Sequence, residues 1–151
     1  MGECEGADSN YGGSAEVLGA MGNLYIIEGR WEDALEAFQR GFELSPLDED
    51  LIIHIAWALN SLRRYPESMA ASNEAISLAP DTMWPYLYKI LNFWGWHGDA
   101  AESRPVLEAI PESPRDWIPW VWFWQEMYEG RYREALDRLA SQRDGWIRTK
   151  M

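Results

Sequence analysis

The chain has 151 residues, a formal net charge of −12 at pH 7, a hydrophobic fraction of 47% and ten tryptophans. This length favours a single domain, and this composition is sufficient for a core rich in aromatic side chains. The acidic balance argues against proteins that bind nucleic acid or anionic lipid through a basic surface. It favours solubility, and it also attracts basic partners.

Cysteine usage and hydropathy indicate the compartment. Cys4 is the only cysteine, so no intramolecular disulfide can form, as is typical of a reducing environment. No apolar run reaches the roughly 18 residues that a membrane-spanning helix needs. The N-terminal residues lack the basic and apolar regions of a signal peptide. We therefore expect a cytoplasmic protein of bacterial type, with no membrane contact.

The first predicted elements are a flexible leader and a pair of helices. Residues 1–13 have almost nothing to bury and are expected to be flexible. Apolar residues at helical spacing predict helices over 15–27 and 31–44. Gly29 suits the left-handed residue that ends the first helix, and Pro46 stops the second.

A second pair of helices follows with the same layout. The first of these helices is capped by Asp48 or Asp50 and runs to Leu62. The second covers residues 66–78, with Pro66 in its first turn, where the missing N–H has no consequence.

The third and fourth pairs are less regular. A helix is expected from Thr82 to Trp94, a turn over 95–98, and a partner helix over 99–110. The fourth pair follows Pro114, and its second helix is expected from Tyr132 to near Gly145, with a tail over 146–151.

The first two pairs align at an offset of 34 residues, with bulky residues on bulky ones, small on small and proline on proline. A fixed period of this size is typical of stacked helical repeats. The aligned positions are Leu18, Gly22, Tyr25, Trp31, Gly41 and Pro46 in the first pair and Ile52, Ala56, Leu59, Tyr65, Ala75 and Pro80 in the second.

These residues resemble the tetratricopeptide repeat (TPR). The first repeat matches the family pattern closely, the third is the most divergent, and the register slips by one residue on entering it. The resemblance implies an all-α fold, a right-handed α-solenoid of about four antiparallel helix pairs. The repeats are expected at about 15–48, 49–81, 82–114 and 115–145, within a domain over 14–145.

In proteins of this family the first helix of each repeat lines a concave face, and the resemblance assigns groove positions to this chain. In the third repeat a shift of one residue exchanges these positions for Trp84, Leu87, Leu91 and Trp94. The candidate partner-binding residues are Asn23, Ile53, Trp57, Asn60, Tyr86, Ile90, Trp94, Trp117, Trp120 and Trp124.

Residues 117–128 form a segment that is apolar almost all round. Such a helix is expected to be buried on more than one side. One interpretation is that a partner covers its outer side, which would make these aromatics an interaction site. The other is that they belong to the core, or that residues 140–151 fold back over them with Trp146.

One subclass of the family holds the free carboxylate of a peptide terminus with Lys, Asn and Arg side chains. Asn23 matches the asparagine of that clamp, but Gly19 replaces the lysine and the other basic positions are not filled. The sequence therefore predicts no carboxylate clamp. Asn23 and Asn60 are either solvated polar residues or hydrogen-bonding partners for an extended peptide backbone.

Catalytic motifs are not found. His54 and His97 are isolated, and Cys4 lacks a structured setting. The acidic clusters are explained by helix caps and solvated faces. We therefore predict no catalytic residue, no metal site and no cofactor.

The sequence favours a non-enzymatic scaffold or adaptor that binds a peptide or helix, basic or amphipathic, in an aromatic concave groove. The alternative is a self-associating or regulatory module of a larger bacterial signalling protein, such as a cyclase, kinase or transcription regulator. Under that alternative the chain forms a homodimer. A small apolar ligand in the tryptophan-lined groove is a third hypothesis.

Overall fold

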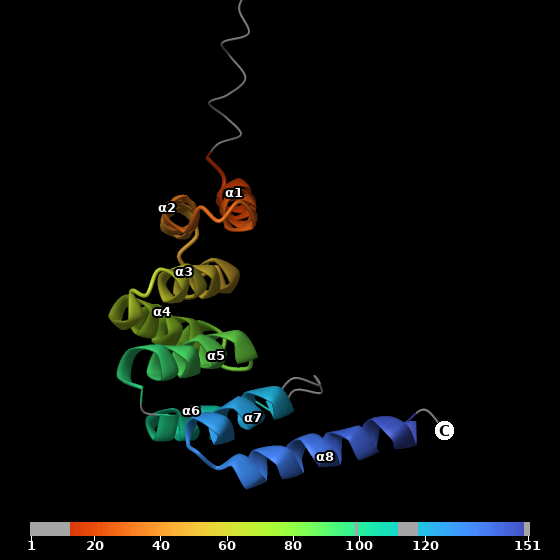
Figure 1. Ribbon diagram of the computed structural model, residues 1–151. Coiled ribbons are helices and arrows are strands. Elements are labelled where there is room, and N and C mark those ends of the chain that lie inside the picture. Colours follow the sequence, from red (N-terminus) through yellow and green to blue (C-terminus); the bar gives the residue numbers. More distant parts are fainter. Residues whose placement is uncertain (1–12, 99, 112–117, 150–151) are drawn as a thin grey trace, which may run out of the picture.

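The computed structural model describes residues 13–98, 100–111 and 118–149, and within these ranges every regular element is helical. The helices stack one after another, from α1 at one end to α8 at the other (Figure 1). The elements are α1 Ala15–Ile27, α2 Trp31–Leu44, α3 Glu49–Ser61, α4 Tyr65–Leu78, α5 Met83–Asn92, η1 Phe93–His97, η2 Ala100–Ser103, α6 Arg104–Glu108, α7 Ile118–Tyr128 and α8 Tyr132–Thr149.

The first two helix pairs begin and end where the sequence predicts, because side chains and turns satisfy their terminal amides. The Ser14 hydroxyl accepts a hydrogen bond from the Val17 amide, at 3.2 Å, and caps α1. Asp48 caps α3 by accepting from the amides of Asp50 and Leu51. These contacts fix where each first helix starts.

A residue with a left-handed backbone closes the turn inside each pair. Gly29, Gly98 and Gly130 take this role with φ of 75°, 64° and 73°. In the second pair the residue is Arg63, with φ of 58°. Glycine adopts this conformation without a steric penalty, whereas an arginine does not.

The larger of two hydrophobic clusters lies between α1 and α5. Its centre includes Phe38, Ile52 and Leu59, which are all buried. A Cβ added at Gly22 would lie 2.4 Å from the nearest atom of the Phe38 ring. The absence of a side chain at this position therefore sets how closely α1 approaches α2, as the repeat pattern predicts.

The smaller cluster joins α5, α6 and α7 around Ile90, Leu107 and Val121. It contains fewer buried apolar residues than the larger one. The two clusters make the N-terminal half of the stack the better packed part of the described chain.

The second helix of the third pair differs from the prediction. Instead of one helix over 99–110, the chain forms a turn of π-helix at η1, the short 3₁₀ segment η2, and α6. Pro105 explains the late start of α6, because proline has no N–H to donate and is accommodated only in a first turn. Asp99, the predicted first residue, lies outside the described residues.

At the C-terminal end, α8 begins at Tyr132 as predicted but continues through Gly145 to Thr149. The tail predicted over 146–151 is thus helical as far as residue 149. A single glycine inside a helix costs only about 1 kcal/mol, and no proline follows to stop the helix. The last part of α8 projects beyond the rest of the stack (Figure 1). The predicted leader, except residue 13, lies outside the described residues.

Candidate functional site

Aromatic rings line up across the first helices of the second and third pairs. The Trp57 ring on α3 meets the edge of Trp31, with 5.6 Å between centroids, and stacks on Tyr88 at 6.4 Å. Tyr88 in turn stacks on Trp84. Burial raises the pKa of the Tyr88 phenol to about 12, so the hydroxyl is neutral at physiological pH. Trp57 and Trp84 are partly exposed on this row of rings.

The register of α5 is decided by which residues it buries. Ile90 has no exposed surface and belongs to the smaller cluster, and Met83 is also buried. The prediction that Ile90 faces the groove is therefore wrong, because its side chain points into the core. The shifted register holds instead, and it places four partly buried residues on the groove side: Trp84, Leu87, Leu91 and Trp94.

Other predicted groove residues have internal partners. Tyr86 donates its hydroxyl hydrogen bond to the Pro80 carbonyl oxygen at 3.1 Å, in the turn before α5. Ile53 is buried in the larger cluster, whereas Asn23 is exposed on α1. Of these three, only Asn23 offers a side chain to a partner without rearrangement.

Asn60 belongs to a chain of hydrogen bonds that joins α3, α4 and α5. Its amide donates to Asn92 Oδ1 at 2.8 Å, and the Asn92 amide donates to Ser68 Oγ at 2.9 Å. Ser68 then donates to the Ala56 carbonyl oxygen at 2.8 Å. Asn92 is fully buried, so these bonds replace its contacts with water. They fix where three helices meet and leave Asn60 partly exposed at the edge.

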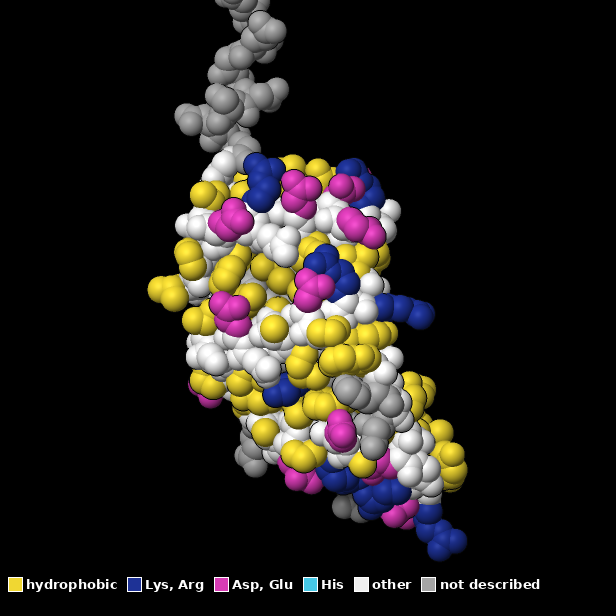
Figure 2. Space-filling model, turned by 90° about the vertical axis from the view of Figure 1, so that its left-hand side faces the viewer, with side chains coloured by type: hydrophobic (Ala, Val, Ile, Leu, Met, Phe, Trp, Pro, Cys, Tyr) yellow, Lys and Arg dark blue, Asp and Glu magenta, His cyan; other side chains and the backbone are white. Residues whose placement is uncertain are grey.

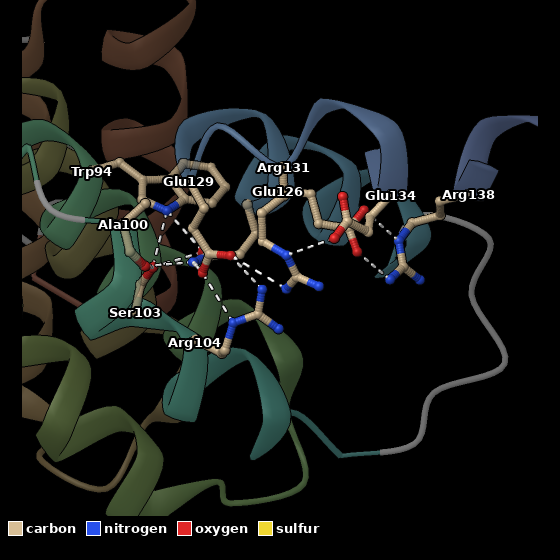
Figure 3. A network of polar contacts seen from close by, with 10 residues as sticks. Trp94, Ala100, Ser103, Arg104, Glu126, Glu129, Arg131, Glu134 and Arg138 are labelled. Atoms are coloured by element: carbon tan, nitrogen blue, oxygen red, sulfur yellow. Dashed lines mark hydrogen bonds and ion pairs between the residues drawn. The ribbon is translucent and has the colours of Figure 1, made fainter. Parts of the chain in front are cut away.

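Trp94 contributes to a second polar network, between η2 and α7 (Figure 3). Its indole N–H lies 3.0 Å from both Ser103 Oγ and Gln125 Oε1 and is shared between them. Gln125 is fully buried and also donates to the carbonyl oxygen of Ala100 and to Glu129 Oε1. The Trp94 ring thus has a structural role, and its far side contacts Tyr128, 4.9 Å away.

Ion pairs extend this network onto α8. Arg104 forms a two-bond pair with Glu129, and Arg138 pairs with the buried Glu126 through bonds of 3.0 and 2.6 Å. The Arg104 guanidinium holds the pKa of the Glu129 carboxyl below its usual value. Both pairs are shielded from water, so they hold α6, α7 and α8 in a fixed arrangement.

The outer side of α7 carries the most exposed aromatic surface of the predicted set. Trp120 and Trp124 are 50% and 49% exposed, and Tyr128 follows on the same side of the helix. Phe123 lies between the two tryptophans, with its ring 5.3 Å from Trp124. The prediction that α7 is buried on more than one side is confirmed for the sides facing α6 and α8.

On the face shown in Figure 2, hydrophobic side chains reach the surface along much of the stack, with acidic and basic side chains scattered between them. The predicted groove residue Trp117 lies outside the described residues. Among the residues that the structure describes, no cluster of His, Cys, Asp or Glu could hold a metal ion. No helix in the same ranges is long and apolar enough to cross a bilayer.

Comparison with known proteins accounts for this architecture. A tetratricopeptide repeat profile matches residues 15–48. The first TPR domain of the human RPAP3 protein superposes with a TM-score of 0.63 at 20% identity, covering 86% of this chain and 95% of that one. The Hsp70-Hsp90 organising protein of Plasmodium falciparum is 34% identical over 104 residues. The chain is a tetratricopeptide repeat protein.

Another TPR structure of similar shape is the first TPR of Spaghetti (RPAP3) bound to the HSP90 peptide SRMEEVD. Its TM-score is 0.62 at 19% identity, and it covers 83% of this chain and 95% of that one. The match to the Plasmodium protein covers 68% of this chain but only 40% of the relative. A TPR repeat-containing protein of Methanocaldococcus jannaschii is 24% identical over 124 residues, 76% of this chain and 20% of that one. These relatives do not favour a regulatory module of a signalling protein.

Sequence reasoning missed the polar residues that hold this TPR stack together. Asn92 and Gln125 are fully buried amides, each facing the second helix of the preceding pair. The signal was present, because both occupy the position that Ala58 holds on α3, four residues before the end of the repeat's first helical stretch or its extension. A polar residue at a position expected to be buried indicates a hydrogen-bonded junction.

Proposed function

We propose that this TPR protein is a non-enzymatic adaptor that binds an apolar or amphipathic segment of a partner protein. The observation that supports this most directly is the pair of half-exposed tryptophans on α7, Trp120 and Trp124. They occupy groove positions of the fourth repeat and continue the aromatic row of α3 and α5. Half-buried tryptophans present a large rigid surface at low entropic cost and are enriched among residues that dominate binding energy.

The charge at the groove positions argues for a different peptide from those bound by the structural relatives. The RPAP3 domains were solved with the peptides SRMEEVD and SGPTIEEVD, which are acidic. In this chain the groove positions carry Glu16 and Asp50 but no Lys or Arg. An acidic peptide would therefore meet a net charge of −12 with no cation to pair with its terminal carboxylate.

We infer that the bound segment is apolar on one face and basic on the other. A helix of this kind would bury its apolar residues on the α7 and α5 rings, and its basic side chains would be attracted by the acidic surface. The cytoplasmic location proposed here rests on the single cysteine and the acidic composition.

The test is calorimetric titration with two synthetic probes, an amphipathic helix of Leu and Lys and the acidic peptide SRMEEVD. The first is expected to bind with an affinity that falls as salt increases, and the second is expected not to bind. Tight binding of SRMEEVD alone would overturn the proposal.

A double variant, Trp120→Ala with Trp124→Ala, is expected to weaken binding of the Leu and Lys probe at least tenfold, about 1.4 kcal/mol or more. The matched control is Trp96→Ala, because Trp96 is similarly exposed at 47% but lies outside the groove positions. Far-ultraviolet circular dichroism checks that each variant is folded. Unchanged affinity in the double variant would contradict a groove on α7.

A further inference from the structure

The first helix of each internal pair buries the same face against the helix before it. On α3 this face is Leu51, Ile55 and Ala58, which are all buried. A Cβ added at Gly41 of α2 would lie 3.2 Å from Leu51, so the two helices touch there. The junction between α2 and α3 is thus apolar and closely packed.

The same three positions form the next two junctions. On α5 they are Pro85, Lys89 and Asn92, and the last two donate hydrogen bonds to Asn73 and Ser68 of α4. On α7 the last two are Trp122 and Gln125, which contact Arg104 and Ser103 of the preceding pair. At the last position Ala58, Asn92 and Gln125 all have no exposed surface.

On α1 the corresponding residues are Val17, Met21 and Leu24, which lie 34 residues before Leu51, Ile55 and Ala58. Leu24 is 60% exposed, because none of the described residues packs over this side of α1. The helix therefore presents to water an apolar face of the kind that α3 buries. We call Val17, Met21 and Leu24 the α1 end face.

The other end of the stack has the complementary face. On α2, Trp31 contacts Trp57 of the following pair and Leu35 is buried. Aligning Gly29 with Gly130 places Tyr132 and Leu136 of α8 at these two positions. They are 60% and 63% exposed, and we call them the α8 end face.

We propose that copies of this chain associate head to tail, with the α8 end face of one copy packed on the α1 end face of the next. The two faces are the two halves of one type of junction, the type that α2 and α3 form inside each copy. They lie at opposite ends of the stack (Figure 1), so each copy offers both and the contact does not close on itself. The proposal goes beyond peptide binding and leaves the α7 groove positions free.

Charge decides the conditions under which this association forms. The helix α1 carries Glu16 and no basic residue, whereas α8 carries four arginines and three acidic residues. The local charges are therefore compatible. The net charge of −12 on each copy opposes association at low salt. Salt screens this repulsion while the apolar contact remains, so association increases with ionic strength.

Sedimentation equilibrium of the 151-residue chain, at low and high ionic strength, provides the test. The mean mass is expected to rise with protein concentration, and more steeply at high salt. Leu24→Glu and Leu136→Glu each place a charge on one end face, and each is expected to abolish the rise. Because both leucines are mostly exposed in the single copy, the fold is expected to persist, as circular dichroism would show. The control is Leu47→Glu, which alters an 81% exposed leucine away from both end faces and should leave the rise unchanged.

Mixing the two variants distinguishes this contact from a symmetric one. Leu24→Glu keeps an intact α8 end face and Leu136→Glu keeps an intact α1 end face, so the mixture is expected to form 1:1 dimers and nothing larger. Wild-type chain that stays monomeric at high concentration and high salt overturns the proposal, whichever segment or protein covers these faces. So does either single variant that still associates by itself, because that result indicates pairing of like faces.

Discussion

Single residues without side chains, or with unusual backbone angles, set the geometry of this stack. Gly22 allows α1 to lie against the Phe38 ring, and Gly29 closes the first turn with φ of 75°. Both roles were predictable from the sequence, since the repeat pattern requires a small residue at one position and a left-handed one at the other. Arg63 departs from the second of these requirements.

Gly22→Ala is expected to destabilise the protein by about 2 kcal/mol, because overpacking a core costs about 1–3 kcal/mol and Phe38 is fully buried and held in place. This outweighs the gain in helix propensity, about 1 kcal/mol. Urea denaturation measures the change. Gly19→Ala serves as the control, because its Cβ would meet only the tip of the Leu51 side chain, at 3.2 Å. Equal stability changes for the two variants would contradict the packing argument.

Arg63→Gly is expected to raise the free energy of unfolding by about 0.5–1 kcal/mol. The left-handed conformation costs a non-glycine residue about 1–2 kcal/mol, and glycine gives back part of this through the entropy of the unfolded chain. The neighbouring change Arg64→Gly is the control, since Arg64 has φ of −83° and pairs with Glu67. It should lower the melting temperature, whereas Arg63→Gly should raise it.

At the scale of helices, the two halves of the chain are joined by different means. Leu51 and Ile55 pack α3 on α2 through apolar contact, whereas Gln125 and Glu129 hold α7 to η2 and α6 through hydrogen bonds and an ion pair. Periodicity predicted the helices of the first half well. It failed at η1, η2 and α6, where Pro105 shortens the second helix of the pair.

Glu129→Gln is expected to make stability less sensitive to acid. Arg104 lowers the pKa of Glu129 in the folded state, so the stabilising contribution is complete above the pKa of the unfolded chain, near 4.3. It is lost as pH falls through the lower folded value. Wild-type protein should therefore lose more stability than the variant between pH 6 and pH 3, measured by urea midpoints. Glu43→Gln, at an exposed site on α2, should follow the wild-type pH curve.

For the whole molecule, the distribution of the core predicts an uneven stability. The cluster between α1 and α5 holds most of the buried apolar residues, and the cluster that includes α7 is small. In a stack where each repeat contacts only its neighbours, the less packed end opens first.

Native-state hydrogen exchange should therefore show the slowest amides on α2, α3 and α4 and faster exchange on α7 and α8. Phe38→Ala should accelerate exchange throughout the stack, because it removes a side chain from the centre of the larger cluster. Leu107→Ala should act mainly on α6, α7 and α8. Uniform exchange across all helices would contradict this view of the fold.

The sequence by itself determined the repeat, the positions of α1 to α4 and the small residues between them. It could do so because these features depend on local spacing, in which an apolar stripe, a left-handed turn residue and a proline recur every 34 residues. It also identified Trp120 and Trp124 as groove positions, although their binding role stays a prediction.

Only the tertiary structure decided the register of α5, the burial of Ile90 and the hydrogen-bonded junctions at Asn92 and Gln125. It also showed that Leu24 and Leu136 are exposed while the corresponding residues Ala58 and Leu35 are buried. Equivalent positions in a repeat have the same local surroundings, but burial depends on whether a neighbouring helix lies over them. A pattern in one chain cannot contain that information, because it is a property of the stack.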